Sequence, residues 1–182
     1  MKESDWVKGN LEQSINMIDS IFEIMACGVD NRYHTLDTIG EQSIASHSWG
    51  VAIILEYLEP NVSKDLIMKA LTHDVTEAYT GDMPSPIKWS HPEFKEILNR
   101  VEEEYEEVLG IDQYNIISDE EKILYKQADM FELLFFCMKQ RRMGNTNMNK
   151  VFSKGVEFLA SQKLNERGSL LLGQLIKLYG GI

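Results

Sequence analysis

The stretch KDLIMKALTHDVTEAY, residues 64–79, combines a helical pattern with the most unusual polar residues of the chain. Its apolar side chains recur at intervals of three and four residues, which is typical of one face of an α-helix. His73, Asp74 and Glu77 interrupt this apolar run, although the whole chain contains only 4 histidines. The stretch therefore predicts a helix over about residues 64–79 with a cluster of polar side chains in it.

The same periodicity continues on both sides of this stretch. It predicts a first helix that ends near Gly28 and a second from about Ser43 to Leu58, which Pro60 stops. The apolar face of the first helix is formed by Leu11, Ile15, Ile18, Ile21, Phe22 and Met25. That of the second is formed by Ile44, His47, Val51, Ile54, Leu55 and Leu58.

Two serine motifs predict where later helices begin. Residues 90–93, SHPE, resemble a capping box with proline in the first turn, opening a helix to about Leu109. Residues 118–121, SDEE, form a second capping box, opening a long helix to about Met143. One or two further helices are expected over residues 150–179.

No segment alternates with the two-residue period of a strand for long enough to indicate a sheet. Two loops are expected, at residues 29–42 and 80–91. A chain of 182 residues has room for one domain and is short for two. The sequence therefore predicts an all-α single domain spanning residues 1–182.

Composition limits the classes of function. With 43% hydrophobic and 26% charged residues the chain is typical of a soluble globular protein. Its net charge of −11 disfavours a nucleic-acid polymer as partner, whereas a small phosphorylated molecule can bind where a metal and local Arg or Lys reverse the field. Cys27 and Cys137 lie in apolar stretches without a CxxC motif, which favours two buried thiols.

Two further features of the sequence bear on the cellular location of the protein. The N-terminal residues MKESDWVKGN are charged and polar, unlike a signal peptide. No apolar run approaches the roughly 18–20 residues that cross a bilayer, so no membrane partner is expected. We therefore expect a cytoplasmic protein.

A divalent metal site is one interpretation of the polar cluster. On a helix, Glu77 shares a face with His73 and Asp74, which are about 100° apart around the axis. His47 and Asp129 are further candidates because each is polar within an apolar face, where a carboxylate is costly unless paired or metal-bound. Imidazole and carboxylate suit Zn, Mn, Fe or Co. The simpler interpretation is a hydrogen-bonded core histidine, a solvated glutamate and an aspartate paired with Lys or Arg.

Several motifs together resemble a known family. They are Arg32-Tyr33, Ser46-His47-Ser48, His73-Asp74-x-x-Glu77, residues 80–88 (TGDMPSPIK), and residues 118–129 with SDEEK and KQAD. Their order, H…HD…D, resembles the HD-domain metal-dependent phosphohydrolases. The match from about residue 30 to 140 is closest to the YfbR-type 5′-deoxynucleotidases, and the first motif is also similar to phage-type dATP triphosphohydrolase relatives. The resemblance implies a single HD-domain helical bundle.

The resemblance also assigns roles in catalysis. One divalent metal ion, Co, Mn, Zn, Fe or Mg, is expected to be bound by His47, His73, Asp74 and Asp129. Glu77 is expected to position a water molecule or move its proton. Asp82 is implied to shape the site or help to protonate the leaving oxygen.

Other residues are expected to bind a deoxynucleotide substrate. Arg32 and Lys88 would clamp the phosphate, which compensates for the acidic charge of the chain. Tyr33 or Trp49 would stack on the base, with core packing as an equal alternative for Trp49. His34 faces either the phosphate or the solvent, and His91, at the start of a helix, is expected to be structural.

The predicted reaction is hydrolysis of a deoxynucleoside monophosphate (dNMP) to deoxynucleoside and phosphate. Two alternatives stay open: a triphosphohydrolase of deoxynucleoside triphosphates (dNTPs), and a nucleotide-sensing HD domain without turnover. The related families usually carry Glu or Asp before the first metal histidine, where this chain has Ser46, and that departure gives the sensor some support. Relatives also suggest a homo-oligomer, for which the leucine-rich segment 170–178 offers an interface.

Overall fold

The computed structural model describes residues 17–181, apart from the side chains of Ser85, Pro86 and Trp89. Over this range the chain is helical, with no strand and a single isolated antiparallel bridge between Asn31 and Ser43. The elements in chain order are α2 (Met17–Cys27), α3 (Ile44–Leu58), α4 (Lys64–Thr72), α5 (Glu77–Thr80), α6 (Ser85–Ser90), α7 (Pro92–Leu109), the 3₁₀ helix η1 (Asp112–Asn115), α8 (Asp119–Arg142), α9 (Asn149–Ala160) and α10 (Glu166–Gly180). The predicted all-α fold is confirmed.

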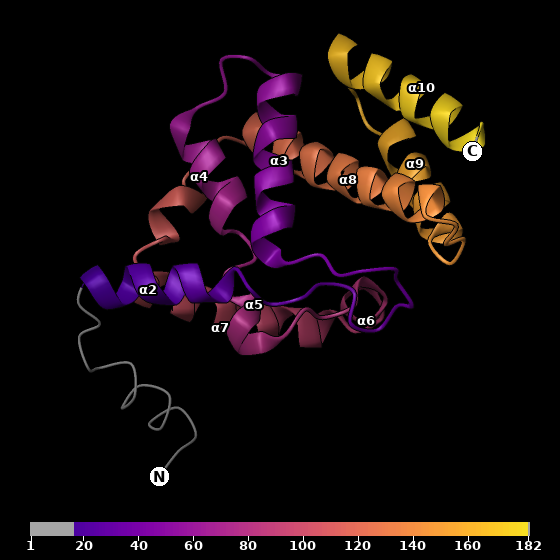
Figure 1. Ribbon diagram of the computed structural model, residues 1–182. Helices are drawn as coiled ribbons and strands as arrows, with labels where there is room; N and C mark the ends of the chain where they lie inside the picture. Colours follow the sequence, from indigo (N-terminus) through magenta and orange to yellow (C-terminus); the bar gives the residue numbers. More distant parts are fainter. Residues whose placement is uncertain (1–16, 182) are drawn as a thin grey trace.

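The helices form two groups. The long helix α8 packs against α3 and α9, and α4 packs on α3, while α10 lies against α8, α3 and α9 (Figure 1). At one end of the molecule α2, α5 and α6 lie along α7. The fully buried side chains of the main core include Leu55, Leu58, Leu66, Phe131, Leu134, Met148 and Leu159. A smaller cluster beneath the second group is formed by Cys27, Val75, Leu109 and Ile111.

Serine caps place the two helices that carry most of the core. The Ser43 side chain accepts a hydrogen bond from the Ser46 backbone N–H, so α3 begins where predicted. Ser118 and Glu121 form the expected capping box at the start of α8. The ends of both helices match the prediction to within one residue.

The capping box predicted at residues 90–93 is wrong, although α7 does run to Leu109 as expected. Ser90 is the last residue of α6, and its hydroxyl contacts the Ile87 carbonyl and the His91 ring instead of capping α7. An N-cap residue needs a non-helical backbone, which Ser90 lacks because α6 includes it. His91 takes the N-cap position without a side-chain cap, so it lies at a helix start as expected.

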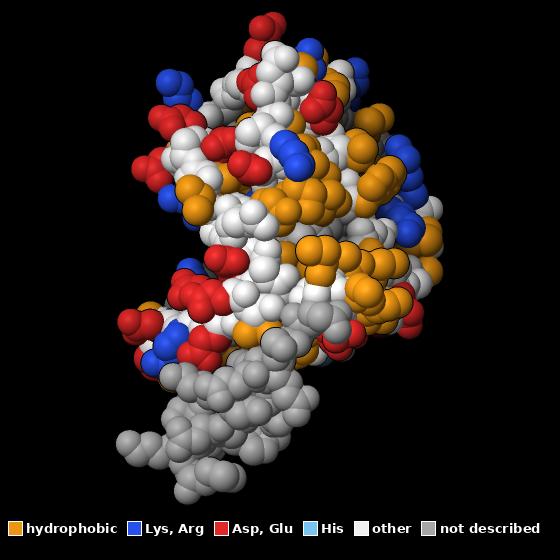
Figure 2. All heavy atoms as spheres, turned by 90° about the vertical axis from the view of Figure 1, so that its left-hand side faces the viewer, with side chains coloured by type: hydrophobic (Ala, Val, Ile, Leu, Met, Phe, Trp, Pro, Cys, Tyr) orange, Lys and Arg blue, Asp and Glu red, His pale blue; other side chains and the backbone are white. Residues whose placement is uncertain are grey.

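Helix α2 ends where predicted, while Leu11 and Ile15 lie outside the described residues. Its apolar face is exposed, with Ile18 at 64%, Phe22 at 66% and Met25 at 69%. The helix is instead anchored to the smaller core cluster through Ile24 and Cys27. Figure 2 shows one face of the molecule, where exposed hydrophobic side chains lie among many acidic ones.

The remaining apolar segments also divide between core and surface. In α10, Leu172 and Leu175 are buried, whereas Leu170, Ile176 and Leu178 are about half exposed. Homo-oligomerisation through this segment stays a prediction. Cys27 and Cys137 are buried free thiols, as predicted. Among the described helices, none combines the length and apolar character needed to cross a membrane.

Candidate metal centre

The first candidate ligand, His47, lies in the first half of α3 and is fully buried. Its ring has polar partners on both sides. The Nδ1 atom lies 2.6 Å from Oε2 of Glu132, and Nε2 faces His73 and Asp129. Since a carboxylate accepts, Nδ1 carries a proton, and Nε2 is the ring nitrogen that faces these two residues.

The helix predicted over residues 64–79 is interrupted at His73. Helix α4 ends at Thr72, residues 73–76 form turns, and α5 begins at Glu77. Thr72, Val75 and Thr76 are β-branched and weaken helical continuity, and bonds such as Glu77 N–H to the Asp74 carbonyl, 3.0 Å, tighten the chain. The helical-face argument for Glu77 is therefore replaced by a turn.

This turn fixes His73 at the C-cap of α4. Its Nδ1–H donates to the Ala70 carbonyl at 2.8 Å, satisfying an acceptor that the helix end leaves open. The Nε2 atom consequently carries the lone pair and faces His47, 3.2 Å from its Nε2. Both imidazoles thus present the same kind of donor atom to the same point.

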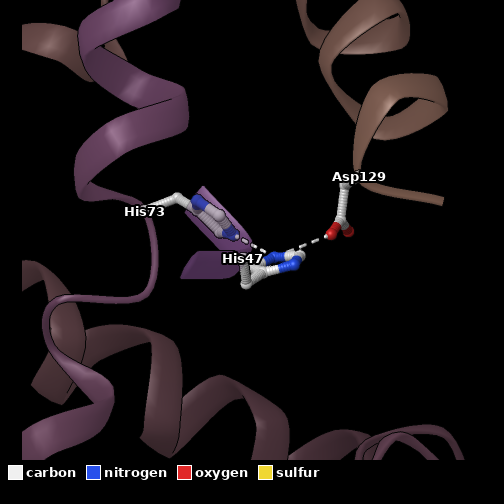
Figure 3. Close-up of side chains that lie close together, drawn as sticks. All are labelled: His47, His73 and Asp129. Carbon is white, nitrogen blue, oxygen red and sulfur yellow. Dashed lines mark hydrogen bonds and ion pairs between the residues drawn. The ribbon is translucent and has the colours of Figure 1, made fainter. Parts of the chain in front are cut away.

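Asp129, from α8, completes a group of three. Its Oδ1 lies 3.2 Å from Nε2 of His47, and the donor atoms of His47, His73 and Asp129 are all within 4.8 Å of one another. Figure 3 shows His47 between the other two side chains, which come from separate parts of the chain. The group joins α3, the turn after α4, and α8.

The fourth predicted ligand, Asp74, lies beside this group. One carboxylate oxygen is 3.0 Å from Nε2 of His73 and the other is 3.5 Å from Nε2 of His47. The latter oxygen also forms an ion pair with Arg32, whose side chain is mostly buried. Asp74 is therefore shared between the histidines and the arginine.

The charged side chains of this group shift one another's pKa values. Burial acts to raise the pKa of Asp74, but His73 and Arg32 outweigh it and hold this pKa well below its usual range. Asp129 shows the same balance, in which contact with His47 outweighs burial and lowers the pKa. Burial lowers the pKa of His47, yet the two carboxylates at its ring raise it to about 9. The carboxylates favour a positive charge between them.

Glu77 is buried next to this group. One carboxylate oxygen is 3.6 Å from Nζ of Lys88, and the other is buried without a hydrogen-bond partner among the described residues. Burial and the charge of Asp74 raise the pKa of Glu77 to about 8 in the absence of a metal. A buried carboxylate oxygen without a partner is unusual, and it leaves this atom available to a water molecule or a ligand.

Asp82, in the loop after α5, contacts the loop that carries Arg32 and Tyr33. Its Oδ2 accepts a hydrogen bond from the Tyr33 backbone N–H at 3.0 Å and lies 3.9 Å from Nδ1 of His34. Tyr33 has φ of 61°, a left-handed backbone that is unusual for a tyrosine. Asp82 thereby holds the loop that delivers Arg32. His34 is more than half exposed.

The two aromatic candidates occupy different surroundings. The Tyr33 ring stacks on Phe136, with centroids 4.6 Å apart, and its hydroxyl is buried without a partner among the described residues. Trp49 is 64% exposed, so core packing is wrong for it. It lines a cavity of about 580 Å³ that also includes Ser46 and Glu132.

Sequence reasoning did not identify Glu132, the buried partner of His47. A signal was present, because Glu132 is a charged residue within the run FELLFF and follows Asp129 by three positions on one helix. Glu132 reaches His47 only because α8 packs against α3, and the two residues are 85 positions apart in the sequence.

The residues fit a divalent ion. The Nε2 atoms of two imidazoles face inward because the Nδ1 atoms of both rings are hydrogen-bonded outward. Carboxylates of Asp129 and Asp74 lie beside them. This mixture of nitrogen and oxygen donors suits Zn, Mn, Fe or Co.

Comparisons with known proteins identify the same kind of domain. A family model described as 5′-deoxynucleotidase YfbR-like matches residues 29–171. The chain is 28% identical over 138 residues to the 5′-deoxynucleotidase YfbR of Escherichia coli O1:K1 / APEC, covering 63% of this chain and 69% of that protein. It is 25% identical over 159 residues to a 5′-deoxynucleotidase of Enterobacter sp. (strain 638), covering 75% and 79% respectively.

Two solved structures share the fold. One is the cyanophage S-2L HD phosphohydrolase DatZ, described as bound to dA and one catalytic Zn²⁺ ion, with a TM-score of 0.67 and 22% identity over 88% of this chain and 96% of that one. The other is the PH0347 protein of Pyrococcus horikoshii OT3, with a TM-score of 0.69 and 22% identity over 88% and 99%. Since the family model spans most of the sequence, the chain belongs to the YfbR-like 5′-deoxynucleotidase family, as its motifs predicted.

Proposed function

We propose that this protein is a metal-dependent phosphohydrolase that converts deoxynucleoside monophosphates into deoxynucleosides and phosphate. The observation that carries the proposal is the convergence of His47, His73 and Asp129 next to a buried Glu77 with an unpartnered oxygen. Membership of the YfbR-like family, whose curated relatives are called 5′-deoxynucleotidases, supports the same reaction.

The proposed metal ligands are His47, His73, Asp129 and Asp74. A divalent ion held by them would neutralise charge on a phosphate oxygen and lower the pKa of a bound water molecule. Zn, Mn, Fe and Co suit the two imidazoles better than Mg does, because Mg prefers oxygen ligands. The Zn²⁺ in the structure of DatZ supports a divalent ion here without fixing its identity.

Glu77 is the proposed general base. Its unpartnered oxygen accepts a proton from water as the water oxygen bonds to phosphorus and the bond from phosphorus to the 5′ oxygen breaks. The departing 5′ oxygen then takes up the proton held by Glu77, which forms the deoxynucleoside and regenerates the carboxylate. Asp82 is proposed to support this step by fixing the loop that carries Arg32, through its hydrogen bond to Tyr33.

Arg32 and Lys88 are proposed to bind the phosphate. Both lie at the acidic cluster, Arg32 against Asp74 and Lys88 against Glu77. Together with a divalent ion, these two cations would offset the acidic charge around a bound phosphate in a chain with a net charge of −11. Tyr33 and Trp49 are proposed to contact the base.

The test is to identify the products formed from a panel of dNMPs and dNTPs by liquid chromatography. Reactions would contain Co²⁺, Mn²⁺, Zn²⁺ or Mg²⁺ in turn, with EDTA as the control. Deoxynucleoside and phosphate from dNMPs alone are expected. Triphosphate released from a dNTP would instead establish the triphosphohydrolase, and no turnover in metal-loaded protein would favour the nucleotide sensor.

A further inference from the structure

Glu132 holds the outer side of His47. Its Oε2 accepts the Nδ1–H hydrogen bond at 2.6 Å, and both residues are buried, at 7% and 0% exposed. The carboxylate comes from α8, which also carries Asp129. One helix therefore contacts both nitrogens of the His47 ring, Asp129 at Nε2 and Glu132 at Nδ1.

The carboxylate of Glu132 is itself fixed. Its Oε1 accepts a hydrogen bond from Nε2 of Gln42 at 2.7 Å, and Gln42 is also buried. Space for it depends on Gly50 of α3, where an added Cβ would lie 2.9 Å from Cγ of Glu132. A glycine inside a helix is unfavourable, so this position accommodates the glutamate at a cost to the helix.

The two histidines of the candidate metal centre differ in the partner of their Nδ1 atoms. His73 donates its Nδ1–H to a neutral carbonyl, that of Ala70, whereas His47 donates to a carboxylate. A carboxylate partner fixes the tautomer and makes the opposite nitrogen a stronger donor to a metal. Ser46, the residue before His47, supplies no such charge, and its backbone N–H is bound by the cap Ser43.

We propose that Glu132 is a positioning residue for the metal centre. It orients the His47 ring with Nε2 towards His73 and Asp129, and strengthens this nitrogen as a ligand. The inference rests on the proposed metal-dependent function, because it concerns how tightly one ligand binds the ion.

The first measurement is metal affinity, obtained by competition of each variant with a chromogenic chelator for Co²⁺ and Zn²⁺. Glu132→Gln removes the charge at nearly constant shape, and Glu132→Ala also removes the acceptor. Losses of about 10-fold and up to about 100-fold in affinity are expected, the range typical of such outer partners. The matched control is Glu106→Gln, another buried glutamate, which pairs with Lys69 and Asn115 and should bind metal as the wild type does.

The second measurement reports on the ring directly. Because the chain has 4 histidines, ¹⁵N-histidine labelling gives few signals, and single His→Ala variants assign them. In the Zn²⁺-loaded wild type the His47 Nδ1 proton is expected to be strongly hydrogen-bonded and slow to exchange. In Glu132→Ala that proton signal should move upfield or disappear, while the His73 signal stays.

The outcomes separate the two proposals. Metal affinity in both Glu132 variants within twofold of Glu106→Gln, with an unchanged His47 proton signal, would overturn the role of Glu132 and leave the metal site intact. A wild-type protein that binds neither Co²⁺ nor Zn²⁺ would overturn the proposed function together with this inference.

Discussion

Arg32 and Asp74 form an ion pair that links the loop after α2 to the turn after α4. The same carboxylate is 3.0 Å from Nε2 of His73, so the arginine and the candidate metal centre share one aspartate. An arginine that releases Asp74 when phosphate arrives would couple substrate binding to completion of the ligand set. A substitution of Arg32 should therefore affect substrate turnover and metal affinity in different ways.

Arg32→Ala should lower kcat/KM for a dNMP by about 10- to 100-fold, because it removes charge-assisted hydrogen bonds to phosphate worth roughly 1.5–3 kcal/mol. Metal affinity should be maintained or increased, since Asp74 loses its competing partner. Steady-state kinetics and chelator competition measure the two quantities. Arg100→Ala, on the exposed side of α7, is the control, and a loss of metal affinity in Arg32→Ala would contradict the assignment.

Metal removal should destabilise the protein. The Nε2 atoms of His47 and His73 lie 3.2 Å apart beside the carboxylates of Asp129 and Asp74, so one ion can bind both rings and both carboxylates in the folded state alone. Metal at 100 times its Kd adds about 2.7 kcal/mol, or roughly 5–11 °C in Tm for a chain of this size. Differential scanning fluorimetry with and without EDTA measures this shift.

The control for that shift is another histidine. His47→Ala should abolish the metal-induced rise in Tm, while His91→Ala, at the N-cap of α7, should retain it. Equal shifts in the two variants would remove His47 from the ligand set.

The sequence predicted the helices that local signals specify. The caps Ser43 and Ser118 and the stop at Pro60 act within a few residues, and α3 and α8 have the expected limits. The ligand candidates His47 and Asp129 were also recognisable, because a polar side chain on an apolar helical face needs a partner.

Features that depend on contacts between helices were not predictable in this way. The break at His73 arises from a turn that competes with a favourable helical pattern, and the role of Glu132 depends on α8 packing against α3. The exposure of the apolar face of α2 was also not predictable, because an apolar pattern along one helix does not reveal whether another helix packs against it.

The carboxylate ligands should be separable from the general base. Asp74→Asn and Asp129→Asn should abolish metal-dependent turnover with the fold intact, because each removes a negative charge next to the histidines. Retained turnover in metal-loaded Asp74→Asn would exclude Asp74 as a ligand. Circular dichroism and product analysis by liquid chromatography check the two parts of this prediction.

Glu77→Gln should bind metal as the wild type does but lose about 10²- to 10⁴-fold in kcat, the usual contribution of a general base. The substitution keeps the shape of the buried side chain and removes its ability to accept a proton. Single-turnover kinetics at saturating metal measures the rate. A variant with the wild-type rate would exclude Glu77 from the chemistry.

Glu77 should also give the metal-free protein a characteristic pH dependence. Burial and Asp74 raise its pKa from an ordinary 4.5 to about 8, so the folded state retains a proton that the unfolded state has released. The resulting stabilisation is complete below pH 4.5 and is lost as the pH rises towards 8, because over this interval the unfolded state ionises at Glu77 while the folded state stays protonated. Glu77→Gln does not ionise, so in EDTA its Tm should rise relative to the wild type across this interval. Glu157→Gln, exposed on α9, gives the baseline, and a Tm difference between Glu77→Gln and the wild type that stays constant with pH would show that Glu77 is ionised throughout.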